Sequence, residues 1–225
     1  MNRRKFLMLT LSLVFSLFTL SSANALDYSF TGNFTNDNDV QLFSFTVGAT
    51  SNVVLETWSY AGGVNAAGQT IARGGFDPIL AVFDSTGALV GQNDDGGPSY
   101  RAVDLSGAAW DSYLNLTTLV ADNYTVAVMQ YNNFAWSSNL SDGFEHDSAY
   151  DPSGANFTRV LTGHNSGLFW DVSGSAYNSR NGNWAFDILG VEQASTAVPE
   201  PATMLLLGSG LIGLAGYGRK KFFKK

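Results

Sequence analysis

Short β-prone runs and turn-forming clusters alternate through the middle of the chain and restrict the folds that it can adopt. Runs rich in Val, Ile, Thr, Phe and Tyr are separated by Gly, Asn, Asp and Ser, and no stretch shows helical periodicity for more than three turns. We therefore expect an all-β domain at residues 26–194, folded as an antiparallel β-sandwich of the jelly-roll type. The predicted strands are Tyr28–Phe34, Val40–Val47, Ser51–Trp58, Pro78–Phe83, Ala88–Gly91, Asp111–Leu119, Tyr124–Tyr131 and Asn183–Val191.

Two turn sequences support a sandwich. Residues 83–88 (FDSTGA) contain the Asp and Gly that a tight turn needs. Residues 119–124 (LVADNY) resemble the tyrosine corner of Greek-key sandwiches, in which a tyrosine hydroxyl bonds back to the backbone a few residues upstream. Tyr124 is the residue that we expect to make this bond.

The first 25 residues have the organisation of a secretory signal peptide. Basic residues open the segment, Phe6–Leu20 forms its apolar core, and Ala23 and Ala25 form an A-x-A cleavage site. We expect signal peptidase to cut after Ala25, so that Leu26 becomes the first mature residue. The basic residues also resemble a twin-arginine export motif, but the Leu- and Phe-rich apolar core favours the general secretory route.

The C-terminal end of the chain has three parts in a fixed order. An uncharged apolar run of 17 residues, Ala202–Gly218, lies between a proline-containing element and a basic end. A helix of this run would rise about 26 Å, close to the roughly 30 Å of a bilayer core, so we expect a single transmembrane helix. The basic end should stay in the cytoplasm, which places the middle of the chain outside. The stiff, extended element before the run is formed by Val198, Pro199, Glu200 and Pro201.

This order resembles the PEP-CTERM sorting signal of exported bacterial proteins, and residues 198–201 match its VPEP signature letter for letter. We assign residues 195–225 to this sorting segment. The resemblance implies transient anchoring in the inner membrane and processing by an exosortase-type membrane transpeptidase. It also implies release to the cell surface or extracellular matrix of an exopolysaccharide-producing Gram-negative bacterium. The alternative is a plain tail anchor, which has no need for the two prolines.

The middle of the chain is strongly acidic. Residues 26–200 contain four arginines, no lysine and all nineteen acidic residues of the chain, which gives a net charge of −15. Such a surface repels nucleic acid and anionic lipid, so we expect no nucleic-acid partner. It favours solubility and is compatible with binding divalent cations or neutral polysaccharide. Because the chain has no cysteine, core packing or a bound ion must stabilise the fold.

Four stretches of the middle form a recognisable set: residues 37–45 (DNDVQLFSF), 76–84 (FDPILAVFD), 93–97 (NDDGG) and 124–128 (YTVAV). They resemble the bacterial pre-peptidase C-terminal domain, a β-sandwich module of secreted enzymes and surface proteins. The resemblance covers Tyr28–Tyr131, and residues 132–183 depart from it. The arrangement as a whole is similar to a group of PEP-CTERM exoproteins of unknown function.

Clusters of Asp and Asn at predicted strand starts and loops indicate a calcium site. Calcium takes about six to eight hard oxygen ligands from carboxylates, amides and backbone carbonyls. In a sandwich these clusters could meet at one end. The alternative is that they only form turns, because Asn, Asp and Gly dominate loops without any metal. The candidate calcium ligands are Asp37, Asp39, Asp77, Asn93, Asp94 and Asp95.

A turn-rich loop at residues 131–136 has the composition of a sugar-binding surface. Its aromatic residues Tyr131, Phe134 and Trp136 stand beside asparagines, and exposed aromatic faces among such polar groups commonly bind sugars in sandwiches. The alternative is that these rings pack in the core. Further aromatic candidates are Trp58, Tyr60 and Trp110.

The sequence contains no convincing catalytic motif. It has two histidines and no cysteine, and neither G-x-S-x-G nor H-E-x-x-H occurs. Nineteen acidic residues offer many possible glycosidase pairs, but the sequence selects none of them. We therefore predict a protein that is not an enzyme.

These features predict an exported, single-domain β-sandwich that serves as a structural or adhesive component of a biofilm or exopolysaccharide matrix. Calcium is the one cofactor that the residues suggest. The alternative function is a calcium-dependent carbohydrate-binding module with exopolysaccharide as its partner. A secreted hydrolase is the third interpretation.

Overall fold

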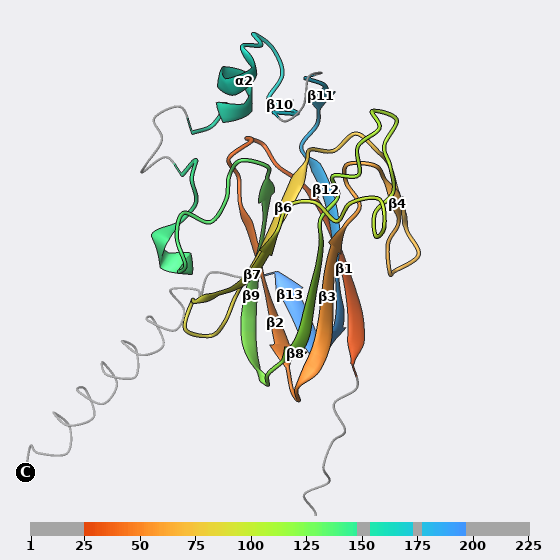
Figure 1. The fold of residues 1–225 in the computed structure, drawn as a ribbon, viewed down its shortest axis with the longest axis vertical. Coiled ribbons are helices and arrows are strands. Elements are labelled where there is room, and N and C mark those ends of the chain that lie inside the picture. Colours follow the sequence, from red (N-terminus) through yellow and green to blue (C-terminus); the bar gives the residue numbers. More distant parts are fainter. Residues whose placement is uncertain (1–24, 148–153, 173–176, 197–225) are drawn as a thin grey trace, which may run out of the picture.

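The computed structural model describes residues 25–147, 154–172 and 177–196. The predicted signal peptide, the VPEP motif and the predicted transmembrane helix lie outside these ranges. The described residues form two antiparallel sheets packed face to face, with short strand pairs and short helices outside them (Figure 1). This arrangement confirms the predicted β-sandwich.

The two sheets have the strand orders β1-β12-β3-β8 and β13-β2-β9-β6-β7. The first consists of β1 (Leu26–Asn33), β12 (Asn183–Val191), β3 (Ser51–Thr57) and β8 (Tyr113–Leu119). The second consists of β13 (Gln193–Thr196), β2 (Gln41–Val47), β9 (Asp122–Gln130), β6 (Pro78–Phe83) and β7 (Leu89–Asn93). The short elements are β4 (Gly63–Val64) paired with β5 (Thr70–Ile71), β10 (Phe169–Trp170) paired with β11 (Ser179–Arg180), and the helices η2 (Leu140–Asp142) and α2 (Phe157–Thr162).

Consecutive long strands mostly lie in opposite sheets. Among the described residues, the chain changes sheet after each long strand except β6, which forms a hairpin with β7. β1 pairs with β12, with Tyr28 opposite Ile188, so the first long strand lies beside one of the last. Such winding between two sheets is typical of the jelly-roll arrangement that the sequence predicts.

All eight predicted strands are present, and two have the predicted bounds, Pro78–Phe83 and Asn183–Val191. The sequence patterns missed the two-residue strands, the short helices and β13, because such short segments carry too little periodicity. β13 pairs with β2 from Gln193 to Thr196, so the sandwich extends at least to Thr196 rather than to residue 194.

Aromatic side chains fill much of the core between the two sheets. β2 and β3 alternate buried and more exposed residues, as strands with one face toward a core do. The ring centroid of Phe43 lies 4.6 Å from that of Phe30, 4.8 Å from that of Phe186 and 5.6 Å from that of Trp184. Burying one large apolar side chain contributes about 1.5–3 kcal/mol, so this cluster stabilises a fold that has no disulfide.

β6 is buried on both faces, which explains its continuous apolar sequence. Leu80 and Val82 face the core between the sheets, whereas Ile79 and Phe83 belong to a second cluster on the outer side of their sheet. Side chains from residues 131–144 cover that outer side. The start of β6 is therefore enclosed from two directions.

Tyr124 forms the predicted tyrosine corner. Its hydroxyl donates a hydrogen bond of 2.9 Å to the carbonyl oxygen of Val120. Its ring stacks on Phe45 with 5.3 Å between the centroids. This bond ties the turn between β8 and β9 to the core.

Replacing Tyr124 with Phe should remove this bond and keep the ring. We expect Tyr124→Phe to lower the free energy of unfolding by about 1 kcal/mol, the contribution of a typical neutral hydrogen bond, measured by chemical denaturation. Tyr28→Phe is the matched control, because its hydroxyl makes a more exposed bond of 3.3 Å to the carbonyl of Glu192. We expect that control to change stability by less than about 0.5 kcal/mol. Equal losses in the two variants would contradict a special role for the corner.

Candidate metal centre

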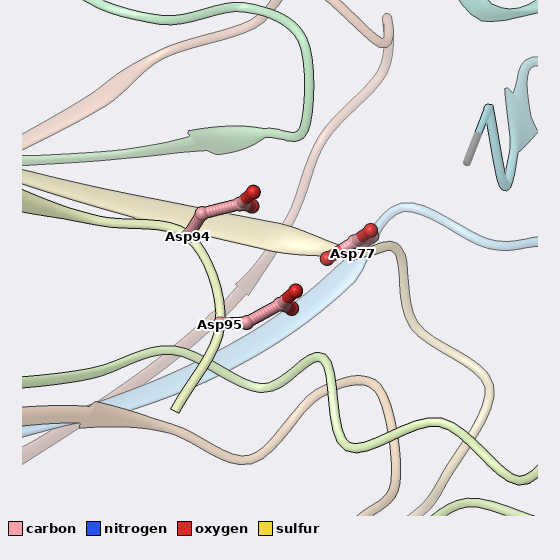
Figure 2. Close-up of side chains that lie close together, drawn as sticks. All are labelled: Asp77, Asp94 and Asp95. Carbon is pink, nitrogen blue, oxygen red and sulfur yellow. The ribbon is translucent and has the colours of Figure 1, made fainter. Parts of the chain in front are cut away.

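Three aspartates converge where β6 begins and β7 ends. Asp77 directly precedes β6, and Asp94 and Asp95 directly follow β7. Because β6 and β7 are antiparallel with Leu80 opposite Asn93, the residue before β6 lies across from the residues after β7. One carboxylate oxygen of each aspartate lies within 4.8 Å of the others, and Asp94 and Asp95 extend toward Asp77 (Figure 2). We call these three residues the aspartate triad.

Ser112, the residue before β8, holds the two segments of the triad together. Its side chain is fully buried. Its Oγ atom lies 2.5 Å from the carbonyl oxygen of Pro78 and 2.7 Å from that of Asp94. One hydroxyl therefore contacts both the start of β6 and the turn after β7. Sequence reasoning missed this residue, because a single serine at a strand start carries no distinguishing signal.

Asn93 and Gly96 shape the turn that carries Asp94 and Asp95. The Asn93 side-chain oxygen accepts a hydrogen bond of 2.9 Å from the backbone N–H of Tyr113, and its Nδ2 donates to the carbonyl of Asp95 at 3.3 Å. A Cβ atom at Gly96 would lie 2.5 Å from Cγ of Arg101, so only glycine allows this close approach. Asn93, a predicted ligand, thus positions the neighbouring carboxylates through its amide.

Burial and mutual repulsion dominate the electrostatics of the triad. Asp77 is 2% exposed, and within the described part of the chain Oδ1 of Asp77 and Oδ1 of Asp94 are buried without a hydrogen-bond partner. Burial, followed by the charges of Asp94 and Asp95, raises the pKa of Asp77 well above its usual value. Burial and the charge of Asp95 raise the pKa of Asp94 to about 7, and burial raises the pKa of Asp95. The triad therefore favours binding either protons or a cation.

The chemistry of the triad suits a hard divalent cation. Carboxylate oxygens are the ligands that calcium and magnesium prefer. Asp95 is exposed, so water has access to the group and can supply further ligands. The guanidinium of nearby Arg101 is directed elsewhere, since it lies 3.9 Å over the ring of Trp58 and pairs with Glu56.

Two other predicted calcium ligands have structural partners. The carboxylate of Asp37 accepts hydrogen bonds from the backbone N–H of Asn156 at 2.6 Å and of Thr158 at 2.8 Å, at the start of α2. Asp37 therefore caps this helix from a distant part of the chain. One oxygen of Asp39 accepts hydrogen bonds from the backbone N–H groups of Thr35 and Asn36. Neither carboxylate belongs to the triad.

The predicted aromatic surface is divided between two partly buried rings and one exposed ring. Tyr131 and Phe134 pack edge to face at 5.7 Å and cover the outer side of the five-stranded sheet. Trp136 is 54% exposed. Tyr131 adjoins the triad, because its backbone N–H donates to the carbonyl of Asp77 at 2.7 Å. Burial and the triad's charges raise the pKa of the Tyr131 hydroxyl.

The other three aromatic candidates take part in packing. Arg101 covers Trp58, Tyr60 is fully buried, and Trp110 lies 5.1 Å from the ring of Tyr60. The burial of Tyr60 excludes it from an exposed sugar-binding surface.

A second buried acidic group shows how the fold neutralises carboxylates elsewhere. Asp171 is fully buried and accepts hydrogen bonds from Arg180 at 3.0 Å and from the Tyr60 hydroxyl at 3.1 Å. Asp104 pairs with Arg73 at 2.6 Å and with Arg180 at 3.5 Å. Among the described residues, the triad has no comparable ion pair with a basic side chain.

Comparison with protein families finds a match at the C-terminus. Residues 197–220 match the PEP-CTERM protein-sorting motif. This motif implies an exported, surface-sorted protein that an exosortase processes. The match does not extend into the sandwich, so the resemblance of Tyr28–Tyr131 to the pre-peptidase C-terminal domain stays a prediction. None of the curated proteins matches the chain.

Within residues 25–147, 154–172 and 177–196, no helix has the length and apolar character needed to cross a membrane. The predicted span, Ala202–Gly218, lies outside these ranges.

Replacing Ser112 with Ala should loosen the triad. The carbonyl oxygens of Pro78 and Asp94 would lose a buried donor, so we expect a loss of about 1–3 kcal/mol in the free energy of unfolding, measured by chemical denaturation. Ser99→Ala, at an exposed position in the following turn, is the control and should stay within about 0.5 kcal/mol of the wild type. If the two variants were equally stable, Ser112 would not hold these segments together.

Proposed function

We propose that this protein is an exported, non-enzymatic structural or adhesive component of the cell surface or of an exopolysaccharide matrix. The match of residues 197–220 to the PEP-CTERM protein-sorting motif is the observation that carries the proposal. The chain would be held briefly at the inner membrane of a Gram-negative bacterium by its C-terminal segment. An exosortase-type transpeptidase would then process that segment.

The character of the sandwich supports a role outside the cell. Its net charge of −15 over residues 26–200 favours a soluble surface that repels nucleic acid and anionic lipid. Its rigidity comes from two packed sheets and a second hydrophobic cluster rather than from disulfides. Such a domain suits a passive matrix component.

A calcium-dependent carbohydrate-binding module is the second candidate. The observation that favours it is the place of the loop at residues 131–136, which begins with a backbone bond to Asp77 of the triad and carries the exposed Trp136. A hydrolase that uses the triad is less favoured, because Asp77 is 2% exposed and a buried carboxylate cannot contact a polymeric substrate. A glycosidase needs two carboxyl groups on either side of the scissile bond.

Intact mass of the protein recovered from the cell surface tests the proposed sorting. In the producing strain, we expect a chain that begins at Leu26 and ends near Pro199. In a strain without the exosortase, the mass should still include residues 202–225. A mass that includes residues 202–225 in both strains would indicate a permanent membrane anchor and would contradict the proposal.

The carbohydrate alternative predicts a role for Trp136. Retention of the full chain on the producer's own exopolysaccharide should fall at least about fivefold in Trp136→Ala, because stacking of an aromatic ring contributes about 1 kcal/mol or more. Tyr177→Ala is the control, since Tyr177 is another exposed aromatic residue, at 46% exposure. Unaltered retention of Trp136→Ala would remove the support for this alternative.

A further inference from the structure

We propose that Asp77, Asp94 and Asp95 bind a calcium ion, which fastens the start of β6 to the turn after β7 when the protein is outside the cell. This site goes beyond the proposed matrix role. Its existence does not depend on how the C-terminal segment is processed.

Two carboxylate oxygens of the triad are buried without a hydrogen-bond partner among the described residues. Asp77 is almost fully enclosed, and its Oδ1 has no hydrogen-bond partner in the described part of the chain. Oδ1 of Asp94 is buried and unpartnered in the same way. A buried polar atom without a partner is unfavourable, and a buried charge is more so. A cation placed among these oxygens would give both atoms a partner of opposite charge and so offset the cost of burying them.

Three other buried acids of the fold have ion-pair or hydrogen-bond partners. Asp171 and Asp104 lie against Arg180, and the oxygens of Asp111 accept hydrogen bonds from Thr57, Tyr60 and Ala61. The fold thus supplies donors to each of these three buried acids, two of which share Arg180. At the triad it brings three acids together, with their oxygens within 4.8 Å. This spacing lets one ion contact all three.

Neighbouring residues hold the two ligand-bearing segments in place. Ser112 contacts the backbone carbonyls of both ligand-bearing segments, and Asn93 bonds to the backbone on each side of the turn. Gly96 lets the turn lie against Arg101 and Tyr113. The hydrogen bonds of Ser112 and Asn93 are made by uncharged groups, so they hold the turn whether or not an ion is bound. Asp95 is the exposed member of the triad.

Calcium fits this ligand set better than other common divalent ions. The triad offers oxygen atoms alone, whereas zinc and copper prefer imidazole or thiolate ligands. The two histidines are engaged elsewhere, His146 stacked on Phe157 at 3.8 Å and His164 on Trp170 at 3.6 Å. Magnesium requires near-octahedral geometry, whereas calcium accepts irregular sets completed by water.

The site should have the affinity of an extracellular calcium module. Such modules bind calcium with a Kd of about 10⁻⁴–10⁻³ M, which suits occupancy outside the cell. Three carboxylates from two short segments, with one of them exposed, form a small site of this kind. Binding would add to contacts that already exist, so the ion would stabilise the fold without being required for it.

Calcium titration of the full chain, purified in mild detergent and stripped with EDTA, tests the proposal. We expect calorimetry to give one site with a Kd of about 0.1–1 mM. At 10 mM calcium, the Tm measured by circular dichroism should rise by about 3–10 °C. Magnesium at the same concentration should raise it by less than half as much.

The variant Asp94→Asn distinguishes a triad that binds metal from one that has only a structural role. The change removes a ligand charge, so calcium affinity should fall at least about tenfold. It also removes repulsion within the triad, so the Tm in EDTA should be equal to or higher than that of the wild type. Glu192→Gln is the control, because Glu192 is exposed and lies in another part of the sandwich, and its calcium response should match the wild type.

Three results would overturn the proposal. The first is no binding heat and no change in Tm at 10 mM calcium. The second is an equal effect of magnesium, which would indicate general charge screening. The third is an unchanged calcium response in Asp94→Asn. None of these results bears on the intact-mass experiment, so failure of the calcium site and failure of the proposed sorting can be told apart.

Discussion

The packing of aromatic rings between the two sheets is the interaction on which the rest of the structure depends. Phe43, on β2, contacts three rings of the opposite sheet, and no disulfide assists this packing. Burial of apolar area is then the main favourable contribution to folding, and it requires strands that alternate in and out. The pairing of β1 with β12 completes one sheet by joining residues that are 150 or more positions apart in the chain.

The double burial of β6 links this core to the aspartate triad. Because β6 is enclosed by the inner core and by the cluster under residues 131–144, the residue that precedes it is enclosed as well. Asp77 occupies that position and carries a carboxylate where an apolar side chain would be expected. Hydrophobic packing thus creates low-polarity surroundings, in which the charged form of the triad's carboxylates is unfavourable. Arg180, which pairs with the buried acids Asp104 and Asp171, makes no ion pair with the triad among the described residues.

The C-terminal motif and the β-sandwich point to different aspects of function. The match at residues 197–220 concerns export and sorting, and it says nothing about the chemistry of the exported part. The sandwich holds the triad and, beside it, a loop with an exposed Trp136. The last described strand, β13, runs to Thr196, and the matched motif begins at the next residue of the sequence.

The sequence by itself determined the local features of this protein. Periodicity and turn residues predicted the β-sandwich, the bounds of Pro78–Phe83 and the corner at Tyr124, because each depends on residues close together in the chain. The VPEP element was equally readable from sequence, since its signature is contiguous. The composition of the candidate site was only partly predictable: Asp77, Asp94 and Asp95 were among the six proposed ligands, and the role of Ser112 was not anticipated.

Only the tertiary structure decided which polar residues meet. Asp37 and Asp77 look alike in sequence, since both are aspartates near the start of a strand. Strand pairing placed Asp77 opposite the turn after β7, whereas Asp37 came to lie against the first turn of α2, about 120 residues away in the chain. The physical reason is that hydrogen-bond partners and burial are set by which strands pair, and pairing joins residues that no local pattern connects.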